Sequence, residues 1–258
     1  MKDKNKDNLI SSLSGITIGF LAGLIGIGGG EYRAPVLICL LRLSVKFAIT
    51  SNLLIGLLVV SASFIRRLDP SVISSVLLIA AIMGCFSVIG SWGSAKITKK
   101  LNDILLKRFL GLLLVIAAIK VLLDADKLLV LNLEINVVSI SLAIIFGFLI
   151  GSLSGLTGIA GGEFRIPALL FIFGMPIKLA GTTNLLVSIP TVLAAFLKHK
   201  KLGHFDRRSM KISVLMGVFS VIGALIGASL VSYVSDRILL TVLSILMLIV
   251  GIKMTWRP

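Results

Sequence analysis

The sequence predicts an all-α protein that crosses a membrane many times and is built from two repeated halves. Three observations predict this: an apolar composition, a series of apolar runs long enough to span a bilayer, and a motif that occurs twice. Of the 258 residues, 57% are hydrophobic and 14% are charged, and the mean hydropathy is +1.10. A soluble core under a polar surface does not need so many apolar residues, so the chain is expected to lie in a lipid bilayer.

The net charge of +15 would suggest a nucleic-acid partner in a soluble protein. Here, most lysines and arginines fall in short connections between apolar runs. The positive-inside rule describes this distribution for membrane proteins, so no nucleic-acid partner is expected. Cys39 and Cys85 lie in apolar runs without a pairing or metal-ligand pattern, so they are expected to be buried thiols, and no metal or cofactor is expected.

The apolar runs define the expected helices in order. A helix needs about 20 apolar residues to cross the hydrocarbon, and eight runs approach this length, although the last is short. They cover residues 9–28, 47–65, 71–95, 104–123, 137–160, 179–197, 212–234 and 238–252. The first run carries one copy of the motif, so it is interpreted as a retained helix rather than a signal peptide.

Two further runs, 35–41 and 167–173, are too short to span the bilayer, and each begins with a proline just after a glycine cluster. Proline is well tolerated in the first turn of a helix, where its missing N–H costs nothing. Each short run is therefore expected to be a half-helix that starts at a break in the chain.

The repeated motif joins these elements. IGIGGGEYRAP at Ile25–Pro35 returns as TGIAGGEFRIP at Thr157–Pro167, 132 residues later, and flanking residues match at the same offset. A first membrane repeat, residues 1–128, and a second, residues 129–258, are therefore expected to form one integrated transmembrane domain.

The charged connections predict the orientation of the halves. The most basic ones are 96–108 and 198–211, and they fall on opposite faces if only the eight long runs cross. If each broken segment is one more crossing, both basic connections and both termini lie on the inner side of the membrane. The acidic connection with Asp124, Asp126 and Glu134 then lies on the outer side. Each half then makes an odd number of crossings, so the repeats are expected to be inverted, as in many secondary transporters.

The breaks are the expected binding site. Glycine lowers helix propensity by about 1 kcal/mol relative to alanine and accepts left-handed backbone angles, so the helix should unwind there. Freed N–H groups and the positive end of the next half-helix suit an anion. The residues expected to bind it are Gly28, Gly29, Gly30, Glu31 and Arg33 at the first break, and Gly161, Gly162, Glu163 and Arg165 at the second. Gly19 and Gly23, repeated at 151 and 155, are expected only to let helices pack closely.

The charged residues of the motif have several interpretations. Arg33 and Arg165 can offer a forked guanidinium to an oxyanion, pair with the glutamates two residues earlier, or reach the membrane interface. Glu31 and Glu163 repel an anion, so they either carry a coupling proton or orient the arginines. A coupling ion or proton therefore remains an open partner.

Polar residues near the start of the following long run also recur. Thr50 and Asn52 match Thr182 and Asn184, and such side chains either line the site or hold helices together. The asparagines are the stronger candidates for lining the site. His199 and His204 lie in the basic connection 198–211 and are expected to be solvated.

The glycine pattern from Gly19 to Pro35, with its second copy from Gly151 to Pro167, resembles the sulfite exporter TauE/SafE family, also called the 4-toluene sulfonate uptake permease family. The resemblance covers nearly the whole chain. It implies a bacterial or organellar membrane transporter of sulfur-containing oxyanions such as sulfite, sulfoacetate or related organosulfonates. The second copy departs from the pattern at Ala160, where the first copy has Gly28, so the two breaks are not expected to be equivalent.

The expected function is alternating-access transport of a small anion through the cell membrane. The rival interpretation is an intramembrane enzyme that hydrolyses lipid phosphates at the duplicated Glu/Arg breaks. Such an enzyme usually needs a nucleophile or general base beside the anion, and none recurs in both halves, so the chain is not expected to be an enzyme.

Overall fold

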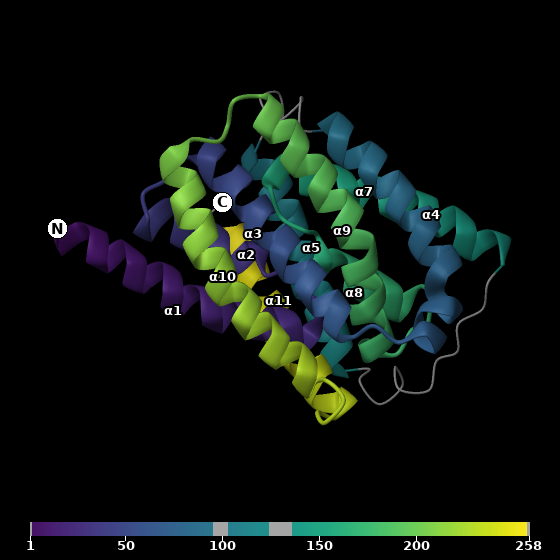
Figure 1. The fold of residues 1–258 in the computed structure, drawn as a ribbon. Helices are drawn as coiled ribbons and strands as arrows, with labels where there is room; N and C mark the ends of the chain where they lie inside the picture. The colour runs from purple at the N-terminus through teal and green to yellow at the C-terminus, as the bar shows by residue number, and fades with distance from the viewer. Residues whose placement is uncertain (1, 95–102, 124–135, 257–258) are drawn as a thin grey trace.

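The computed structural model describes residues 2–94, 103–123 and 136–256, and all secondary structure in these ranges is helical (Figure 1). The first half contains α1 (Lys2–Ile25), α2 (Gly30–Pro35), the π-helical turn η1 (Val36–Leu40), α3 (Val45–Arg66), α4 (Pro70–Ser94) and α5 (Asp103–Leu123). The second half contains α7 (Val137–Thr157), α8 (Gly162–Phe171), α9 (Ile177–Lys201), α10 (Arg207–Leu230) and α11 (Asp236–Trp256).

Seven of the described helices, namely α1, α3, α4, α7, α9, α10 and α11, are long and apolar enough to cross a membrane. The remaining predicted run, 104–123, forms α5, whose segment Leu110–Leu123 is an apolar helix. The prediction of an all-α polytopic membrane protein is confirmed. The acidic connection with Asp124, Asp126 and Glu134, and residues 96–102 of the first basic connection, lie outside the described residues, so the orientation of the halves stays a prediction.

The helices of the two halves pack against each other reciprocally. The first helix of each half, α1 or α7, packs along the fourth helix of the other half, α10 or α4, as Figure 1 shows for both pairs. The third helices, α3 and α9, contact each other as well as those same fourth helices, and α5 packs against α11. Each half therefore contributes helices to both sides of the molecule, and α3 and α9 lie at its centre.

Glycines make the closest of these contacts possible. A Cβ placed on Gly19 would lie 2.2 Å from the carbonyl oxygen of Ser220, and a Cβ on Gly151 would lie 2.2 Å from that of Ser87. No side chain fits at such distances, so the expected close packing at Gly19 and Gly151 is confirmed.

Both predicted breaks interrupt the helices. The chain leaves α1 after Ile25 and α7 after Thr157, and α2 and α8 begin at Gly30 and Gly162. The preceding residues, Gly29 and Gly161, have left-handed φ values of 68° and 76°, which favour glycine strongly.

The predicted start of the half-helices is wrong by about one turn. Pro35 is the last residue of α2, and Pro167 is the sixth residue of α8, rather than the first-turn residues that we expected. The left-handed glycine ends the unwound stretch and lets the Glu and Arg of the motif enter the helix. Directly after Pro35 the first half-helix changes to the π-helical turn Val36–Leu40, whereas α8 continues as an α-helix past Pro167 to Phe171.

The expectation of buried thiols is also wrong, because Cys39 and Cys85 are both exposed on the surface of the protein. In a membrane protein, the lipid-facing surface is as apolar as the core, so an apolar run does not distinguish the two environments.

Candidate functional site

The two breaks meet in the interior of the protein. A Cβ placed on Gly28 would lie 2.4 Å from the Cβ of Ala160, which is the same position in the other copy of the motif. A Cβ on Gly30 would lie 3.3 Å from the Cα of Ile159, and one on Gly162 would lie 3.1 Å from the Cα of Ile27. The unwound backbones therefore touch, with equivalent positions facing each other.

Two asparagines join the breaks by reciprocal hydrogen bonds. Asn52 on α3 donates from Nδ2 to the carbonyl oxygen of Gly158 in the second break, over 2.9 Å. Asn184 on α9, the equivalent residue, donates from Nδ2 to the carbonyl oxygen of Gly26 in the first break, over 2.6 Å. Each amide satisfies a carbonyl that the interrupted helix leaves without a partner.

The same asparagines hold the arginines of the motif. Arg33 donates from Nε to Oδ1 of Asn52, over 3.1 Å, and from Nη2 to the carbonyl oxygen of Gly28. Arg165 donates from Nη1 to Oδ1 of Asn184, over 2.8 Å. Both arginine side chains are fully buried, with 0% exposure, so the interpretation that they reach the membrane interface is wrong.

Both arginines have N–H groups that no described residue accepts. Arg33 Nη1 and Arg165 Nε and Nη2 are buried and have no hydrogen-bond acceptor among the described residues. No ion pair joins either arginine to Glu31 or Glu163 in the described part of the chain. An uncompensated guanidinium N–H in a dry interior is costly, which makes the junction of the breaks suited to a group that brings several acceptors.

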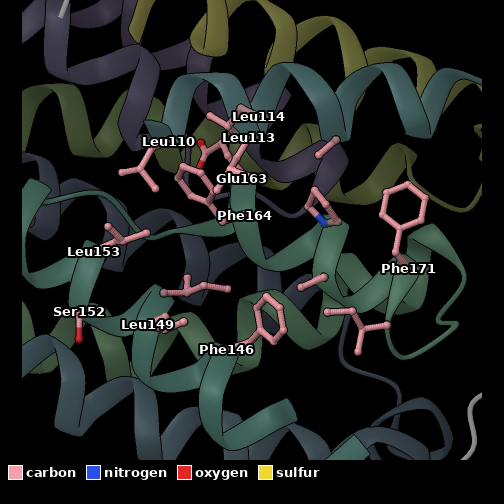
Figure 2. Close-up of a pocket in the computed structure, with 15 residues that line it drawn as sticks. Leu110, Leu113, Leu114, Phe146, Leu149, Ser152, Leu153, Glu163, Phe164 and Phe171 are labelled. Carbon is pink, nitrogen blue, oxygen red and sulfur yellow. The ribbon is translucent and has the colours of Figure 1, made fainter. Parts of the chain in front are cut away.

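The two glutamates of the motif lie in different surroundings. Glu31 is half-buried, whereas Glu163 is 1% exposed and neither of its carboxylate oxygens has a hydrogen-bond partner among the described residues. Glu163 lies in the wall of an apolar pocket of about 470 Å³ between α5, α7 and α8 (Figure 2). Figure 2 shows its carboxylate beside Leu110 and Leu114 of α5, with Phe146 and Phe171 on other walls.

The predicted threonines are not brought to the arginines. Thr50 and Thr182 are buried, but each hydroxyl donates to the carbonyl of the residue four positions earlier in its own helix, Lys46 or Lys178. Their role at the junction therefore has no support from hydrogen bonds, in contrast to the asparagines.

Sequence reasoning missed Ser188, whose hydroxyl accepts a hydrogen bond of 2.8 Å from Arg165 Nη1. The equivalent position in the first half is Gly56, where a Cβ would lie 3.3 Å from Arg33 Nη2. Since serine and glycine do not match, the repeat alignment gave no signal for this contact. The two arginines thus have unequal surroundings.

Sequence reasoning also missed a pair of side chains that cap the first helix of each half. Arg67, the C-terminal cap of α3, donates from Nη2 to the carbonyl oxygens of Gly23 and Leu24 in the last turn of α1. His199, 132 residues later, places Nε2 2.9 Å from the carbonyl oxygen of Gly155 in α7. Gly23 and Gly155 are themselves equivalent, so different residue types make the same contact.

The prediction that His199 is solvated is wrong, because its side chain is 2% exposed. It lies in the last turn of α9 rather than in a loop, and its Nδ1 is 3.3 Å from Nδ1 of His204. The lysines around it account for the error, because their charged ends dominate the sequence of a helix end whose other face is packed.

Burial lowers the pKa of Arg67 to about 10, so its guanidinium remains charged at neutral pH.

Comparisons with known proteins agree with this architecture. The model of the sulfite exporter TauE/SafE family matches residues 2–121 and 143–258. The probable membrane transporter protein YjnA of Bacillus subtilis is 25% identical over 254 residues, which cover 94% of this chain and 97% of that protein. The probable membrane transporter protein YunE of the same organism is 21% identical, with 94% and 95% covered.

The probable membrane transporter protein y4hK of Sinorhizobium fredii is 35% identical over 152 residues, which cover 57% of this chain and 59% of that protein. No solved structure matches the chain. With the family match across both halves, the chain belongs to the sulfite exporter TauE/SafE family of membrane transporters.

Proposed function

We propose that the protein carries small oxyanions across the cell membrane by alternating access, with the substrate bound where the two breaks meet. The observation that carries this proposal is the pair of buried arginines, which come from both halves and have N–H groups without an acceptor among the described residues. An oxyanion has a negative charge and several acceptor oxygens, so it would satisfy these donors. Asn52 and Asn184 orient both guanidinium groups toward the shared site.

Sulfur oxyanions are the substrate class that we propose, because the family is described as sulfite exporters. A planar guanidinium binds two oxygens of a sulfite or sulfonate group at once, which a point charge such as lysine does not reproduce. Sulfite and small organosulfonates are therefore the first substrates to test.

Alternating access is supported by the reciprocal arrangement of the halves. Equivalent contacts occur twice, in the packing of α1 with α10 and of α7 with α4, and in the bonds from Asn52 to Gly158 and from Asn184 to Gly26. We infer that residues 1–128 and 129–258 are inverted repeats and that both termini are cytoplasmic. If each half can adopt the arrangement of the other, the protein has two near-equivalent conformations. One would open the site to one face of the membrane and the second to the opposite face.

Coupling to a proton is the role that we propose for Glu163. Its carboxylate oxygens are buried and have no hydrogen-bond partner in the described part of the chain, and a buried carboxylate in this state becomes less costly when it takes up a proton. The prediction is that Glu163→Gln removes the stimulation of flux by an imposed pH gradient while flux down the substrate gradient persists.

The test of the carrier function is uptake of [35S]sulfite into sealed proteoliposomes. Arg33→Gln and Arg165→Gln should each abolish uptake, whereas Lys200→Gln removes an exposed positive charge outside the site and should leave it unchanged. Equal expression and a monodisperse elution profile show that the variants are folded. Unchanged uptake in both arginine variants would remove the arginines from the site.

The rival function is hydrolysis of lipid phosphates, because a site for oxyanions can also hold a phosphate group. Release of inorganic phosphate from labelled lipid by the purified protein would support this rival, and anion-dependent uptake into vesicles supports the carrier.

A further inference from the structure

Arg67 lies between the first break and a polar pocket at one end of the helices. The pocket has a volume of about 530 Å³, and we call it the Arg67 vestibule. It is formed by the end of α3, the starts of α9 and α11, and the end of α10 with its following turn. Its charged and hydroxyl-bearing walls include Arg66, Arg67, Asp69, Lys178, Thr182 and Asp236.

We propose that the Arg67 vestibule is a second binding site for small oxyanions, from which substrate passes to the breaks, and that Arg67 determines its preference for anions. This inference rests on the proposed function, and it adds an entry site that the symmetric motif does not contain.

No other charged group of the described vestibule occupies the unpartnered donors of Arg67. Lys178 and Asp236 form a salt bridge of 3.2 Å, and Arg66 donates from Nε to the hydroxyl of Ser229 over 2.7 Å. Arg67 uses Nη2 for the carbonyls at the end of α1, while its Nε and Nη1 are buried and have no acceptor among the described residues. With three cations and two carboxylates in the wall, the balance of charge is positive and favours an anion.

The position of Arg67 connects the vestibule to the breaks. Its contacts are with Gly23 and Leu24, which directly precede the end of α1 at Ile25. A Cβ placed on Gly181 would lie 2.9 Å from Arg67 Nη1, and one on Gly26 would lie 2.7 Å from the Cα of Gly181. One guanidinium group and one glycine contact therefore separate the vestibule from the first break.

The other half contains a counterpart that lacks this chemistry. A pocket of about 620 Å³ is lined by Ser44, Lys46, His204 and neighbouring residues, and Lys46 is the equivalent of Lys178. At the place of Arg67 stands His199, whose two ring nitrogens both have contacts, with Gly155 and with His204. Lys46 makes this pocket positive as well, so charge alone does not separate the two pockets. The difference lies in the donors: a neutral imidazole bonded in this way offers no spare N–H, so the Arg67 vestibule rather than its counterpart should bind anions at neutral pH.

Cysteine labelling tests the proposal without a transport readout. In a Cys39→Ala/Cys85→Ala background, Ser232→Cys places a thiol in the Arg67 vestibule, and Ser44→Cys places one in the counterpart; both serines are exposed. A maleimide labels the purified protein in nanodiscs at pH 7.5, with methanesulfonate as the probe and gluconate at equal ionic strength as the reference.

The expected result is that methanesulfonate at twice its dissociation constant slows labelling at position 232 about threefold, in proportion to 1 + [L]/Kd, and does not slow labelling at position 44. Arg67→Gln should remove this protection, and His199→Gln, at the equivalent position, should keep it. If Arg67→Gln does not fold, Arg67→Lys retains the charge without the fork and should weaken the protection.

Protection that persists in the Arg67 variants, or equal protection at both positions, would overturn the proposal. The carrier function is judged separately by uptake: protection without any flux would refute the carrier and leave the vestibule, and flux without protection would do the reverse.

Discussion

The contact between Gly28 and Ala160 predicts a specific pattern of failure and rescue. The two residues occupy the same position of the repeated motif, and a methyl group on Gly28 would lie 2.4 Å from the methyl group of Ala160. Carbon atoms normally approach to about 3.5–4.0 Å, so Gly28→Ala would force the two breaks apart by more than about 1 Å. Overpacking of this kind costs about 1–3 kcal/mol.

The rescue follows from the same geometry. Once Ala160→Gly has removed its methyl group, the nearest atoms to a Cβ on Gly28 are Val60 Cγ1 at 3.6 Å and the Cα of residue 160 at 3.8 Å. Both are ordinary van der Waals distances. The double variant Gly28→Ala/Ala160→Gly therefore moves one methyl group across the junction and should fold, whereas Ala160→Gly alone loses about 0.8 kcal/mol of apolar burial.

Thermal unfolding in nanodiscs, followed by size-exclusion chromatography after heating, measures the effect. For a chain of this size, 1 kcal/mol corresponds to roughly 2–4 °C in Tm. Gly28→Ala should melt lower than the original protein, and the double variant should recover most of the loss. Gly84→Ala is the matched control, because no atom of the residues that the structure describes lies within 4 Å of the added methyl group. A double variant that melts no higher than Gly28→Ala would refute the reasoning.

Three further predictions concern individual hydrogen bonds. Asn184→Leu removes an acceptor from the buried Arg165 and should cost about 1.5–3 kcal/mol, measured as a fall in Tm, together with loss of uptake. Ser188→Ala should lower Tm less than Asn184→Leu, because the equivalent arginine, Arg33, is accommodated beside Gly56, which has no hydroxyl group. An equal or larger fall in Tm would contradict this. Asp206, exposed at the start of α10, accepts hydrogen bonds from the hydroxyl and amide of Ser209, and these lower its pKa below the ordinary value. Because the pKa is lower in the folded state, this cap stabilises the protein at neutral pH and is lost as the pH falls through the folded-state pKa. Asp206→Ala should therefore cost about 0.5–1 kcal/mol at pH 7 and progressively less as the pH is lowered, so a Tm difference that does not shrink in acid would exclude the ionised cap as its cause.

The sequence predicted the elements of the candidate site better than their contacts. Asn52 and Asn184 were singled out because they recur with the motif, and both lie at the junction with the arginines. Thr50 and Thr182 recur equally well, yet their hydroxyl groups remain bonded within their own helices. Recurrence shows that a position is common to both halves, but the direction of a side chain depends on which helix face meets the other half.

Ser188 and the cap formed by Arg67 and His199 show the opposite case. Their equivalence is spatial, since each pair of positions carries different residue types, and no pattern of identities in the chain reveals it. Only the packed structure shows that an arginine in one half and a histidine in the other contact equivalent carbonyls, those of Gly23 in α1 and Gly155 in α7.

The sequence by itself determined that this protein lies in a membrane, that its chain is helical, and where two of its helices break. These properties are local, because composition sets the solvent, apolar run length sets the span, and clustered glycines weaken the helix at their own positions. Only the tertiary structure decided that the breaks touch at Gly28 and Ala160, that the arginines hydrogen-bond to asparagines rather than pair with the neighbouring glutamates, and that Cys39 and Cys85 face outward. These depend on which helix faces meet, and in a bilayer hydrophobicity does not choose between a face that packs on protein and one that packs on lipid.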